Sequence, residues 1–504
     1  MLVVRVLVGS ALASSTELHG TLVGNGIRQA VTINILPDDI FREIFTFCIP
    51  DPHTFEHMWV WQRLVKVCKR WQEIISASPR YLNLHLYCSN GTPNRKNFRY
   101  WPAFPISIVY HLPNYDFLFP LEEDDHDIEL IAALKHPDRV HRIDLDTTTT
   151  GVEHVVAVMQ VPFPVLTLLE FSGPYVDVPA LPGGFLGRSA PCLQHLHLNG
   201  IPFSELPTLL SFARDLVTLQ LHSIPLTGYF SPEAMAEGLA GLTKLRTLRI
   251  EIQSPDPPPE QTTMRPNLPT MAVLPALTEF AFSGESEYLE PLVAQLDAPR
   301  VVDISVEYYI EEVQASQLSR FFIGRTANLK LAPFKGAEAT FLDNAVFIEL
   351  EGDGEGEHPL VGHSVTISGR GSDSQALFMT LVLDQLDASM LSEVEIFTVC
   401  GVSGPFGRQD NMDRTGWLEL LHLFPAVEGM SVYKEMTRHI VSVLEDIAEE
   451  LDTEVLPALH LIYLEDDGDD GNHDNIPSIR IEITTISSLH SSTLIVCTVL
   501  AFRQ

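Results

Sequence analysis

Apolar and polar residues alternate at helical spacing near the amino terminus. Leu36-Pro37-Asp38-Asp39 is typical of a helix start, because a proline at the first helical position has no amide to leave unpaired. The two aspartates place negative charge at the positive end of the helix dipole. Apolar residues then recur every three or four positions, at Ile40, Phe41, Ile44, Phe45 and Cys48. This spacing predicts an amphipathic helix.

The next apolar run, from Val60 to Ser78, predicts a second helix with an unusually wide apolar surface. One stripe comprises Trp61, Leu64, Val65, Cys68 and Ile75. A second, rotated stripe comprises Val60, Leu64, Val67, Trp71 and Ile74. A module of about 40 residues is too small to bury both stripes internally. We therefore expect the remaining apolar surface to bind another protein.

This pair of predicted helices resembles the F-box motif, in particular its fungal type. The matching residues are Leu36-Pro37, Ile40 and Ile44 in the first helix, Val67-Cys68-Lys69-Arg70-Trp71 and Ile74-Ile75 in the second, and Ser78-Pro79 after it. Two features depart from the motif: the Ile49–Trp59 connection is longer than usual, and Tyr81 stands near a position where tryptophan is common. A generic helical hairpin is the alternative.

The resemblance implies binding to the Skp-type adaptor of a cullin-RING ubiquitin ligase, while the rest of the chain selects a protein substrate. On this analogy, a set of residues would form or support the adaptor surface: Leu36, Pro37, Ile40, Ile44, Leu64, Val67, Cys68 and Trp71. Trp71 would be a central aromatic of the kind that often dominates binding energy. Lys66, Lys69 and Arg70 could face an acidic partner or simply be solvated.

From Val140 onward the chain repeats a strand pattern of the type L-x-x-L-x-L. The units begin at Val140, Leu166, Leu193, Leu216, Leu245, Leu277 and Val301, at intervals of 26, 27, 23, 29, 32 and 24 residues. Most intervals fall in the range of leucine-rich repeats, but the regular asparagine of such repeats is missing. The pattern predicts an irregular leucine-rich-repeat-like α/β solenoid. Separate α/β units in a globular sheet are the alternative.

Strand and helix patterns alternate past residue 310, so we expect the solenoid to continue towards the C-terminus. The expected fold class is α/β, with a loosely ordered leader (1–31), an F-box helical module (32–82), a Pro-rich connector (83–127) and a leucine-rich-repeat-like substrate-recognition domain (128–504). The proline-rich stretch Gln253–Pro275 interrupts the repeats as a loop that either guards the binding face or is an inert insertion.

Recognition is expected on the side chains beside the last two apolar positions of each repeat, which would line a concave face. The candidate substrate-binding residues are His195, His197, Gln220, His222, Arg249 and Glu251. The three histidines could approach one another on adjacent strands, so a metal site is an alternative to a polar protein-binding surface. Arg249 could recognise a carboxylate or a phosphorylated substrate, or pair with Glu251.

Composition narrows the possible partners and compartments. Lys and Arg number 32 against 66 Asp and Glu, giving a net charge of −34, which disfavours binding to nucleic acids and anionic membranes. The six cysteines are scattered without a CxxC pair, which indicates reduced thiols and a cytoplasmic or nuclear protein. The alternative is secretion, since the first 15 residues faintly resemble a signal peptide. Leu494–Phe502 is too short to span a bilayer and suits a buried strand.

No stretch of the sequence carries a catalytic, metal or cofactor pattern. Gly362-His363-Ser364-Val365-Thr366 begins like a nucleophile elbow but has threonine where the second glycine must stand. The acidic stretch Glu465–Asp474 lacks the spacing of a calcium loop. We therefore expect a non-catalytic substrate-recognition subunit of a Skp-cullin-F-box ubiquitin ligase, without a cofactor. A repeat-based scaffold outside any ligase is the alternative, and a hydrolase using Ser364 is a distant third.

Overall fold

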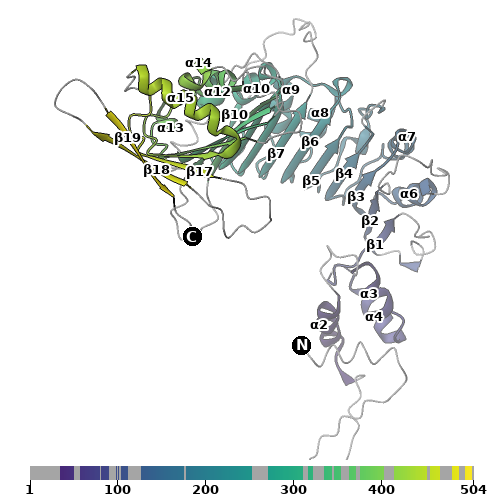
Figure 1. Ribbon diagram of the computed structural model, residues 1–504. Coiled ribbons are helices and arrows are strands. Elements are labelled where there is room, and N and C mark those ends of the chain that lie inside the picture. Colours follow the sequence, from purple (N-terminus) through teal and green to yellow (C-terminus); the bar gives the residue numbers. More distant parts are fainter. Residues whose placement is uncertain are drawn as a thin grey trace, which may run out of the picture. The chain divides into compact units, whose positions relative to one another are not determined.

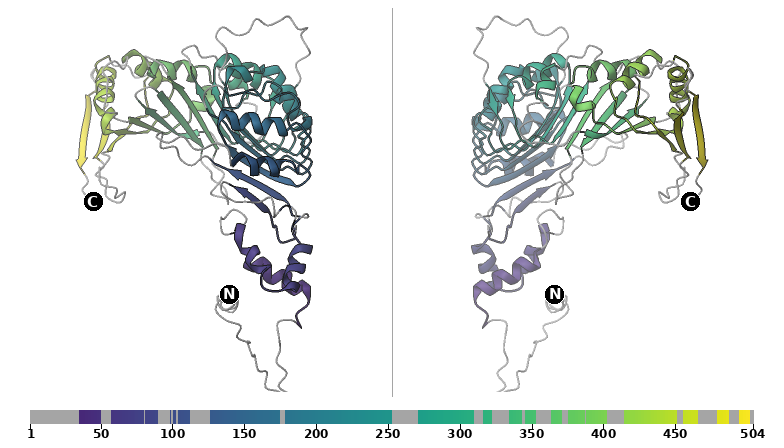
Figure 2. Two further views of the ribbon diagram at one scale, coloured as in Figure 1. Left: turned by 90° about the vertical axis from the view of Figure 1, so that its right-hand side faces the viewer. Right: turned by 90° about the vertical axis from the view of Figure 1, so that its left-hand side faces the viewer.

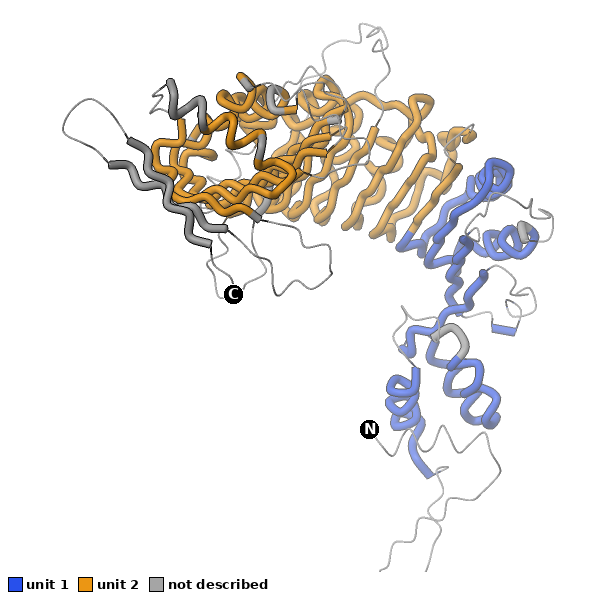
Figure 3. The backbone as a smooth tube through the Cα atoms, in the orientation of Figure 1, with its two compact units in different colours: residues 1–168 blue, residues 169–504 orange. Residues whose placement is uncertain are grey.

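The computed structural model divides into two compact units, residues 1–168 and 169–504 (Figure 3). The structure describes residues 35–49, 57–79, 81–89, 98, 100–101, 104–111, 126–174, 178–252, 271–309, 316–321, 334–342, 345–352, 363–370, 375–386, 388–401, 414–450, 455–465, 479–486 and 494–501. The expected leader at 1–31 lies outside these ranges. So do most of the proline-rich stretch Gln253–Pro275 and all but the first residue of the acidic stretch Glu465–Asp474.

The first unit begins with the helix predicted after the Leu-Pro pair. Helix α2 spans Asp38–Cys48, with Pro37 at its N-cap and both aspartates in its first turn. The Pro37 carbonyl accepts hydrogen bonds from the amides of Ile40 and Phe41, at 3.1 and 3.3 Å. One face of α2 is buried through Phe41 and Phe45. The prediction of an amphipathic helix here is confirmed.

The prediction of one continuous second helix over Val60–Ser78 is wrong. The chain instead forms helix α3, His57–Leu64, and helix α4, Lys69–Ala77. A turn covers Val65–Val67, and Cys68 is extended, with φ −159° and ψ 166°. The two β-branched valines of this turn have low helix propensity, which disfavours a continuous helix here. Leu64 at the end of α3 and Ile75 of α4 are both buried. The two predicted apolar stripes therefore do not lie on one helix.

The remainder of the first unit is a parallel α/β arrangement. Strands β1 (Leu86–Ser89), β2 (Ile106–Tyr110) and β3 (Val140–Asp146) pair in parallel, and helices α6 (His126–Leu134) and α7 (Thr149–Val158) accompany them. The expected connector at 83–127 thus contributes two strands. Arg139 ties the irregular chain between them to the sheet, because its guanidinium donates hydrogen bonds to the carbonyls of Phe98, Trp101 and Phe104 at 2.8 to 3.2 Å.

The L-x-x-L-x-L unit at Val140 forms β3 of the first unit, and the six units after it form strands of the second unit. They are β4 (Leu168–Ser172), β5 (His195–Asn199), β6 (Thr218–Ile224), β7 (Thr247–Ile252), β9 (Glu279–Gly284) and β11 (Asp303–Tyr308). Strands β5, β6, β7, β9 and β11 pair in parallel in this order. Their buried apolar side chains fall in register, as in the row Leu196, Leu219, Leu248, Phe280 and Ile304.

Helices of the second unit pack on one face of this sheet, and no helix of the described residues covers the opposite face, called the open face below (Figure 2). Those beside the first strands are α8 (Leu206–Leu210), α9 (Pro232–Leu239) and α10 (Ser286–Val293), with the short 3₁₀ turns η2 (Phe185–Arg188) and η3 (Leu226–Gly228). The dipeptide strands β8 (Ala272–Val273) and β10 (Leu296–Asp297) form a separate small pair.

Past residue 310 the strands no longer follow one another across the sheet in chain order. Strands β12 (Phe334–Phe341), β13 (Ala345–Gly352) and β14 (His363–Arg370) form an antiparallel meander, and its last strand, β14, pairs in parallel with β11. Its first strand, β12, pairs in parallel with β15 (Ile396–Gly401). This antiparallel meander interrupts the parallel strand order that a solenoid continuing towards the C-terminus would have here.

The sheet then continues to its last strand (Figure 1). Strands β15, β16 (Gly429–Tyr433) and β17 (Leu461–Glu465) are parallel, and β18 (Ile479–Ile486) and β19 (Leu494–Ala501) add antiparallel pairs. The helical segments here are α12 (Gln375–Leu383), α13 (Ala388–Leu391), α14 (Arg414–His422), η4 (Lys434–Met436) and α15 (Thr437–Glu450). The chain is thus a mixed α/β protein with a large, mostly parallel sheet. Among the described residues no helix is both long and apolar enough to cross a membrane.

Candidate protein-binding surfaces

Helix α2 carries two apolar stripes on different sides. The inner stripe is Phe41, Phe45 and Cys48, and its two phenylalanines are fully buried. The outer stripe is Ile40, Ile44 and Phe47, at the same i, i+4, i+7 spacing but rotated by one residue, or about 100°. Ile40 is 45% exposed and Phe47 is 80% exposed. An amphipathic helix needs only the inner stripe for its own core, so the outer stripe is available to a partner.

The residues predicted to form the adaptor surface separate into an outer and an inner group. Pro37, Ile40, Val67 and Cys68 are exposed, and Leu36 and Ile44 are half-buried. Leu64 is buried, and Trp71 is half-buried with its ring edge-on to Phe41 and Phe45, at centroid distances of 5.8 and 4.9 Å. Leu64 and Trp71 therefore support the three helices from inside.

Two exposed apolar residues of this region were not among the predicted ones. Ile35 is 65% exposed, directly before the Leu-Pro pair, and Phe47 is the most exposed large apolar side chain of the outer stripe. The sequence does hold the signal for Phe47, because it stands seven positions after Ile40 and so falls on the same side of the helix.

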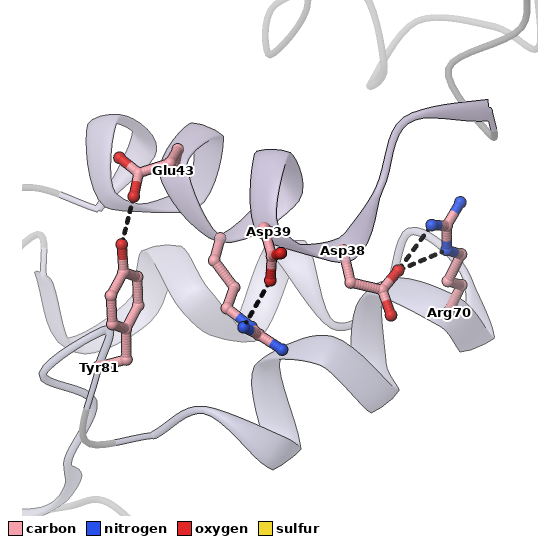
Figure 4. Close-up of polar contacts among 6 residues, drawn as sticks. Asp38, Asp39, Glu43, Arg70 and Tyr81 are labelled. Carbon is pink, nitrogen blue, oxygen red and sulfur yellow. Dashed lines mark hydrogen bonds and ion pairs between the residues drawn. The ribbon is translucent and has the colours of Figure 1, made fainter.

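Arg70 joins α4 to the start of α2 (Figure 4). Its Nη2 lies 2.6 Å from the Asp38 Oδ1 and 2.7 Å from the Leu36 carbonyl oxygen, and its Nε lies 3.1 Å from the same carboxylate. Its guanidinium carbon also lies 4.9 Å from the centre of the Phe41 ring. Arg70 thus serves an internal contact, whereas Lys69 is exposed and lies 3.9 Å from Glu73.

Other polar contacts hold the outside of α2. Arg42 donates a hydrogen bond to Asp39, one turn earlier, at 2.9 Å. The hydroxyl of Tyr81 donates to the Glu43 carboxylate, and this bond raises the pKa of Tyr81 (Figure 4). Tyr81 therefore fixes the chain after α4 against α2 by its polar end.

The second candidate surface is the open face of the sheet in the second unit. The strand register places His197, Gln220, Arg249, Ala281 and Ser305 side by side in one row. A neighbouring row contains His195, Thr218, Thr247, Glu279 and Asp303. His222 is opposite Asn199, and Glu251 is opposite Ser283, on the same face. All six predicted substrate-binding residues thus lie on one face, as expected.

The charged residues of this face pair across strands rather than along them. The Arg249 guanidinium bonds to Glu279 of the next strand, with its Nε 2.8 Å from the Oε1. The expected alternative, an Arg249–Glu251 pair, is wrong. Glu251 instead accepts hydrogen bonds from the Ser223 and Tyr309 hydroxyls, at 3.1 and 3.2 Å, and lies 3.6 Å from His222. The His222 contact, together with these hydroxyls, holds the pKa of Glu251 below its ordinary value.

The histidines do not assemble into a metal site. His195 and His197 stand two residues apart on β5, and His197 lies 3.9 Å from Glu170. Partial burial lowers the pKa of His195. Within the described ranges, no group of three or more His, Cys, Asp or Glu side chains could hold a metal ion. The metal alternative therefore has no support from these residues.

The hydrolase alternative is not supported by the backbone at Ser364. A nucleophile elbow places its serine on a sharp turn between a strand and a helix. Ser364 is instead the second residue of β14, paired with Asp303 on one side and Glu351 on the other.

Comparison of the chain with models of known protein families finds no match, and comparison with curated proteins finds none either.

Proposed function

We propose that this chain is a substrate-recognition subunit of a Skp-cullin-F-box type ubiquitin ligase. The observation that carries the proposal is the outer apolar stripe of α2, which begins directly after the Leu36-Pro37 pair. It combines with the Val67-to-Trp71 sequence at the start of α4, which resembles an F-box. In this proposal residues 32–82 are the F-box module that binds the Skp-type adaptor.

The exposed apolar side chains supply a physical reason for adaptor binding. Ile35, Ile40, Phe47 and Val67 are each 45% exposed or more. Full burial of one such side chain is worth about 1.5–3 kcal/mol, so a few anchors of this kind account for a stable complex. Leu64 and Trp71 would act indirectly, by holding α3 and α4 against α2.

The second unit would hold the substrate. We propose that its parallel repeats are an irregular leucine-rich-repeat-like solenoid whose open polar face, with Gln220, His222 and Arg249, recognises a protein. The in-register apolar rows and the helices on one face support this reading. The chain would perform no chemistry itself, since bringing a substrate close to the ligase raises the rate through proximity. Residence in the cytoplasm or nucleus follows from the same proposal.

Adaptor binding by the purified full-length chain tests the proposal, measured by isothermal titration calorimetry. Two double variants remove candidate anchors: Leu36→Ala with Pro37→Ala, and Ile40→Ser with Phe47→Ser. Phe212→Ser is the matched control, because Phe212 is 55% exposed in the second unit. Each anchor removed should weaken binding by about 1–4 kcal/mol, and the control should bind as wild type does. Folded wild-type chain that fails to bind the adaptor would exclude the ligase role.

A repeat-based binding scaffold outside any ligase is the second candidate function. The break between α3 and α4 favours it, because the matching residues were expected within one helix. On this reading the open sheet face still binds protein, but the helices of residues 32–82 serve another partner. The calorimetric experiment separates the two functions.

A further inference from the structure

Four consecutive repeats of the second unit enter their strands through the same tight turn, at the amino-end edge of the sheet. In each turn an amide donates to the carbonyl three residues earlier, and both of these residues are buried. The donor and acceptor pairs are Leu216 with Ala213, Leu245 with Leu242, Leu277 with Leu274, and Val301 with Ala298, at 3.1 to 3.4 Å. The two residues between each pair are exposed or half-buried. We call residues 212–217, 241–246, 273–278 and 297–302 the turn strip.

The turn strip is positively charged, unlike the chain as a whole, whose net charge is −34. Its four basic and two acidic side chains are Arg214, Lys244, Arg246 and Arg300, and Asp215 and Asp297. The Lys244 Nζ lies 2.7 Å from the Asp215 Oδ1, so these two charges offset each other across neighbouring turns. The three arginines are exposed, and none of their guanidinium groups has a hydrogen-bond or ion-pair partner within the described ranges. Three cations are therefore available on an otherwise acidic protein.

The three arginines precede neighbouring strands of the sheet. Arg214 lies before β6, Arg246 directly before β7 and Arg300 before β11. Strands β6, β7, β9 and β11 are paired in this order, and adjacent strands are about 4.8 Å apart. The arginines are therefore spread over roughly 14 Å of the sheet edge, about the length of four residues of an extended chain. A single peptide segment that runs along this edge can reach all three.

An apolar notch lies beside the arginines, at the residue just before each turn. Phe212 and Val273 occupy this position in the first and third of the four repeats, and they are 55% and 47% exposed. Gly241 occupies it in the repeat between them, and a β-carbon built there would meet no atom within 4 Å. Helix α9, which ends two residues before Gly241, packs against both α8 and β8, so the three positions are neighbours. An apolar side chain of a partner can therefore enter the notch between Phe212 and Val273.

The charge and the notch together select an acidic protein segment as the partner of the turn strip. Arginine binds carboxylates through two parallel hydrogen bonds, and neighbouring exposed apolar side chains mark protein contacts. Nucleic acids and anionic membranes carry a long array of negative charge, which the remaining acidic surface of the chain would repel. A short acidic segment meets mainly the strip, because exposed charges farther away than about 8 Å are largely screened at physiological ionic strength.

We infer that the turn strip binds an acidic segment of a partner protein, pairs its carboxylates with the three unpaired arginines and seats one apolar side chain over Gly241. The inference goes beyond the proposed function, because this surface lies at the edge of the sheet and not on the open face proposed for the substrate. Only the identification of the partner as a ubiquitination substrate would rest on the ligase proposal.

Fluorescence anisotropy with the full-length chain tests the inference. The probe is a fluorescent peptide that repeats Glu-Glu-Leu, and its two companions carry Gln in place of Glu or Ser in place of Leu. Gly241→Leu fills the notch and leaves every charge in place. Arg214→Gln with Arg246→Gln removes two of the unpaired cations. Lys135→Gln with Arg320→Gln is the matched control, because both side chains are exposed and lie outside the turn strip.

The Glu-Glu-Leu peptide should bind the wild-type chain, more weakly as salt is added, and both companions should bind at least about tenfold more weakly. Gly241→Leu and the double arginine variant should each weaken binding about tenfold, whereas the control pair should change it less than about twofold. Phe212→Ser should weaken peptide binding too but leave adaptor binding unchanged, which separates this inference from the ligase proposal.

Four results would overturn the inference. The first is a folded wild-type chain that does not bind the peptide, and the second is wild-type affinity in Gly241→Leu with an unchanged circular dichroism spectrum. The third is an equal loss in the control pair, because general charge attraction would then explain the binding. The fourth is a wild-type dimer, detected by light scattering, that Gly241→Leu dissociates, because a second copy of the chain would then cover the strip.

Discussion

Arg70 of α4 donates hydrogen bonds to the Asp38 carboxylate and to the carbonyl of Leu36, which lies 34 residues earlier in the chain. One guanidinium thereby fixes the first turn of α2 and the residue that precedes it. Arg70 was a candidate for contact with an acidic partner, but its guanidinium instead holds α4 against the start of α2. The candidate adaptor surface depends on this contact as well as on the exposed apolar side chains.

Replacing Arg70 by Met should destabilise the first unit. The change removes an ion pair with half-exposed partners, a bond to a carbonyl and the contact with the Phe41 ring, which together are worth about 1–2 kcal/mol. Urea unfolding followed by tryptophan fluorescence measures the loss. Lys69→Met is the control, because Lys69 is exposed and its pairing with Glu73 contributes little. Equal losses in both variants would contradict the role given to Arg70.

Trp71 and Ile40 should respond differently to truncation. Trp71 packs against Phe41 and Phe45, so Trp71→Ala should lower the unfolding free energy by about 3 kcal/mol, while Trp71→Phe retains most of the contact. Ile40→Ser changes an exposed side chain and should alter stability by less than about 0.5 kcal/mol. Thermal unfolding by circular dichroism measures both effects. A large stability loss from Ile40→Ser would place Ile40 in the core instead of the outer stripe.

Two glutamates on the open face should shift stability in opposite directions at neutral pH. The raised pKa of Glu349 means that its contribution is favourable below the ordinary value of 4.5 and is lost as pH rises through its folded-state pKa. Glu349→Gln should therefore raise the melting temperature at neutral pH. The lowered pKa of Glu251 means that its contribution is present above 4.5 and is lost as pH falls through its folded-state pKa. Glu251→Gln should lower the melting temperature at neutral pH.

Melting curves of these two variants at neutral pH and well below pH 4.5 check the assignment. In the acidic sample both wild-type carboxyl groups become protonated, so each variant should approach the wild-type melting temperature. The same sign for both variants at neutral pH would contradict the different surroundings of the two carboxylates.

Tyr288 should tolerate loss of its hydroxyl group. Its side chain is 1% exposed, and its hydroxyl has no hydrogen-bond partner among the described residues. Burial also raises the pKa of Tyr288. Tyr288→Phe removes an unsatisfied polar atom and should raise the unfolding free energy by about 1 kcal/mol, whereas Tyr288→Ala should lower it by about 3–5 kcal/mol. Tyr309→Phe is the control, since it removes a bond to Glu251 and should cost about 1 kcal/mol.

The sequence allowed the strands of the second unit to be located, because two apolar residues separated by one polar residue mark a strand with one buried face. It did not reveal that Arg249 pairs with Glu279. Arg249 and Glu251 are about 6.8 Å apart along one strand, and Glu279, the diagonal neighbour of Arg249 on the next strand, is at a similar distance of about 7–8 Å, so spacing alone does not decide between the two partners. The break at Val65–Val67 was likewise hidden, since apolar spacing of 3.6 residues continues through the turn.

The pairing of β14 with β11 affects how the second unit can fold during synthesis and where a stable fragment of it can end. Strand β11 ends at Tyr308, but the strand that covers its free edge begins only at His363. During synthesis this edge of β11 therefore stays unpaired until β14, the last strand of the meander, has been added. A fragment cut after residue 310 would keep that edge uncovered, and uncovered strand edges promote aggregation. A well-behaved fragment of the second unit that includes β11 must extend at least through Arg370.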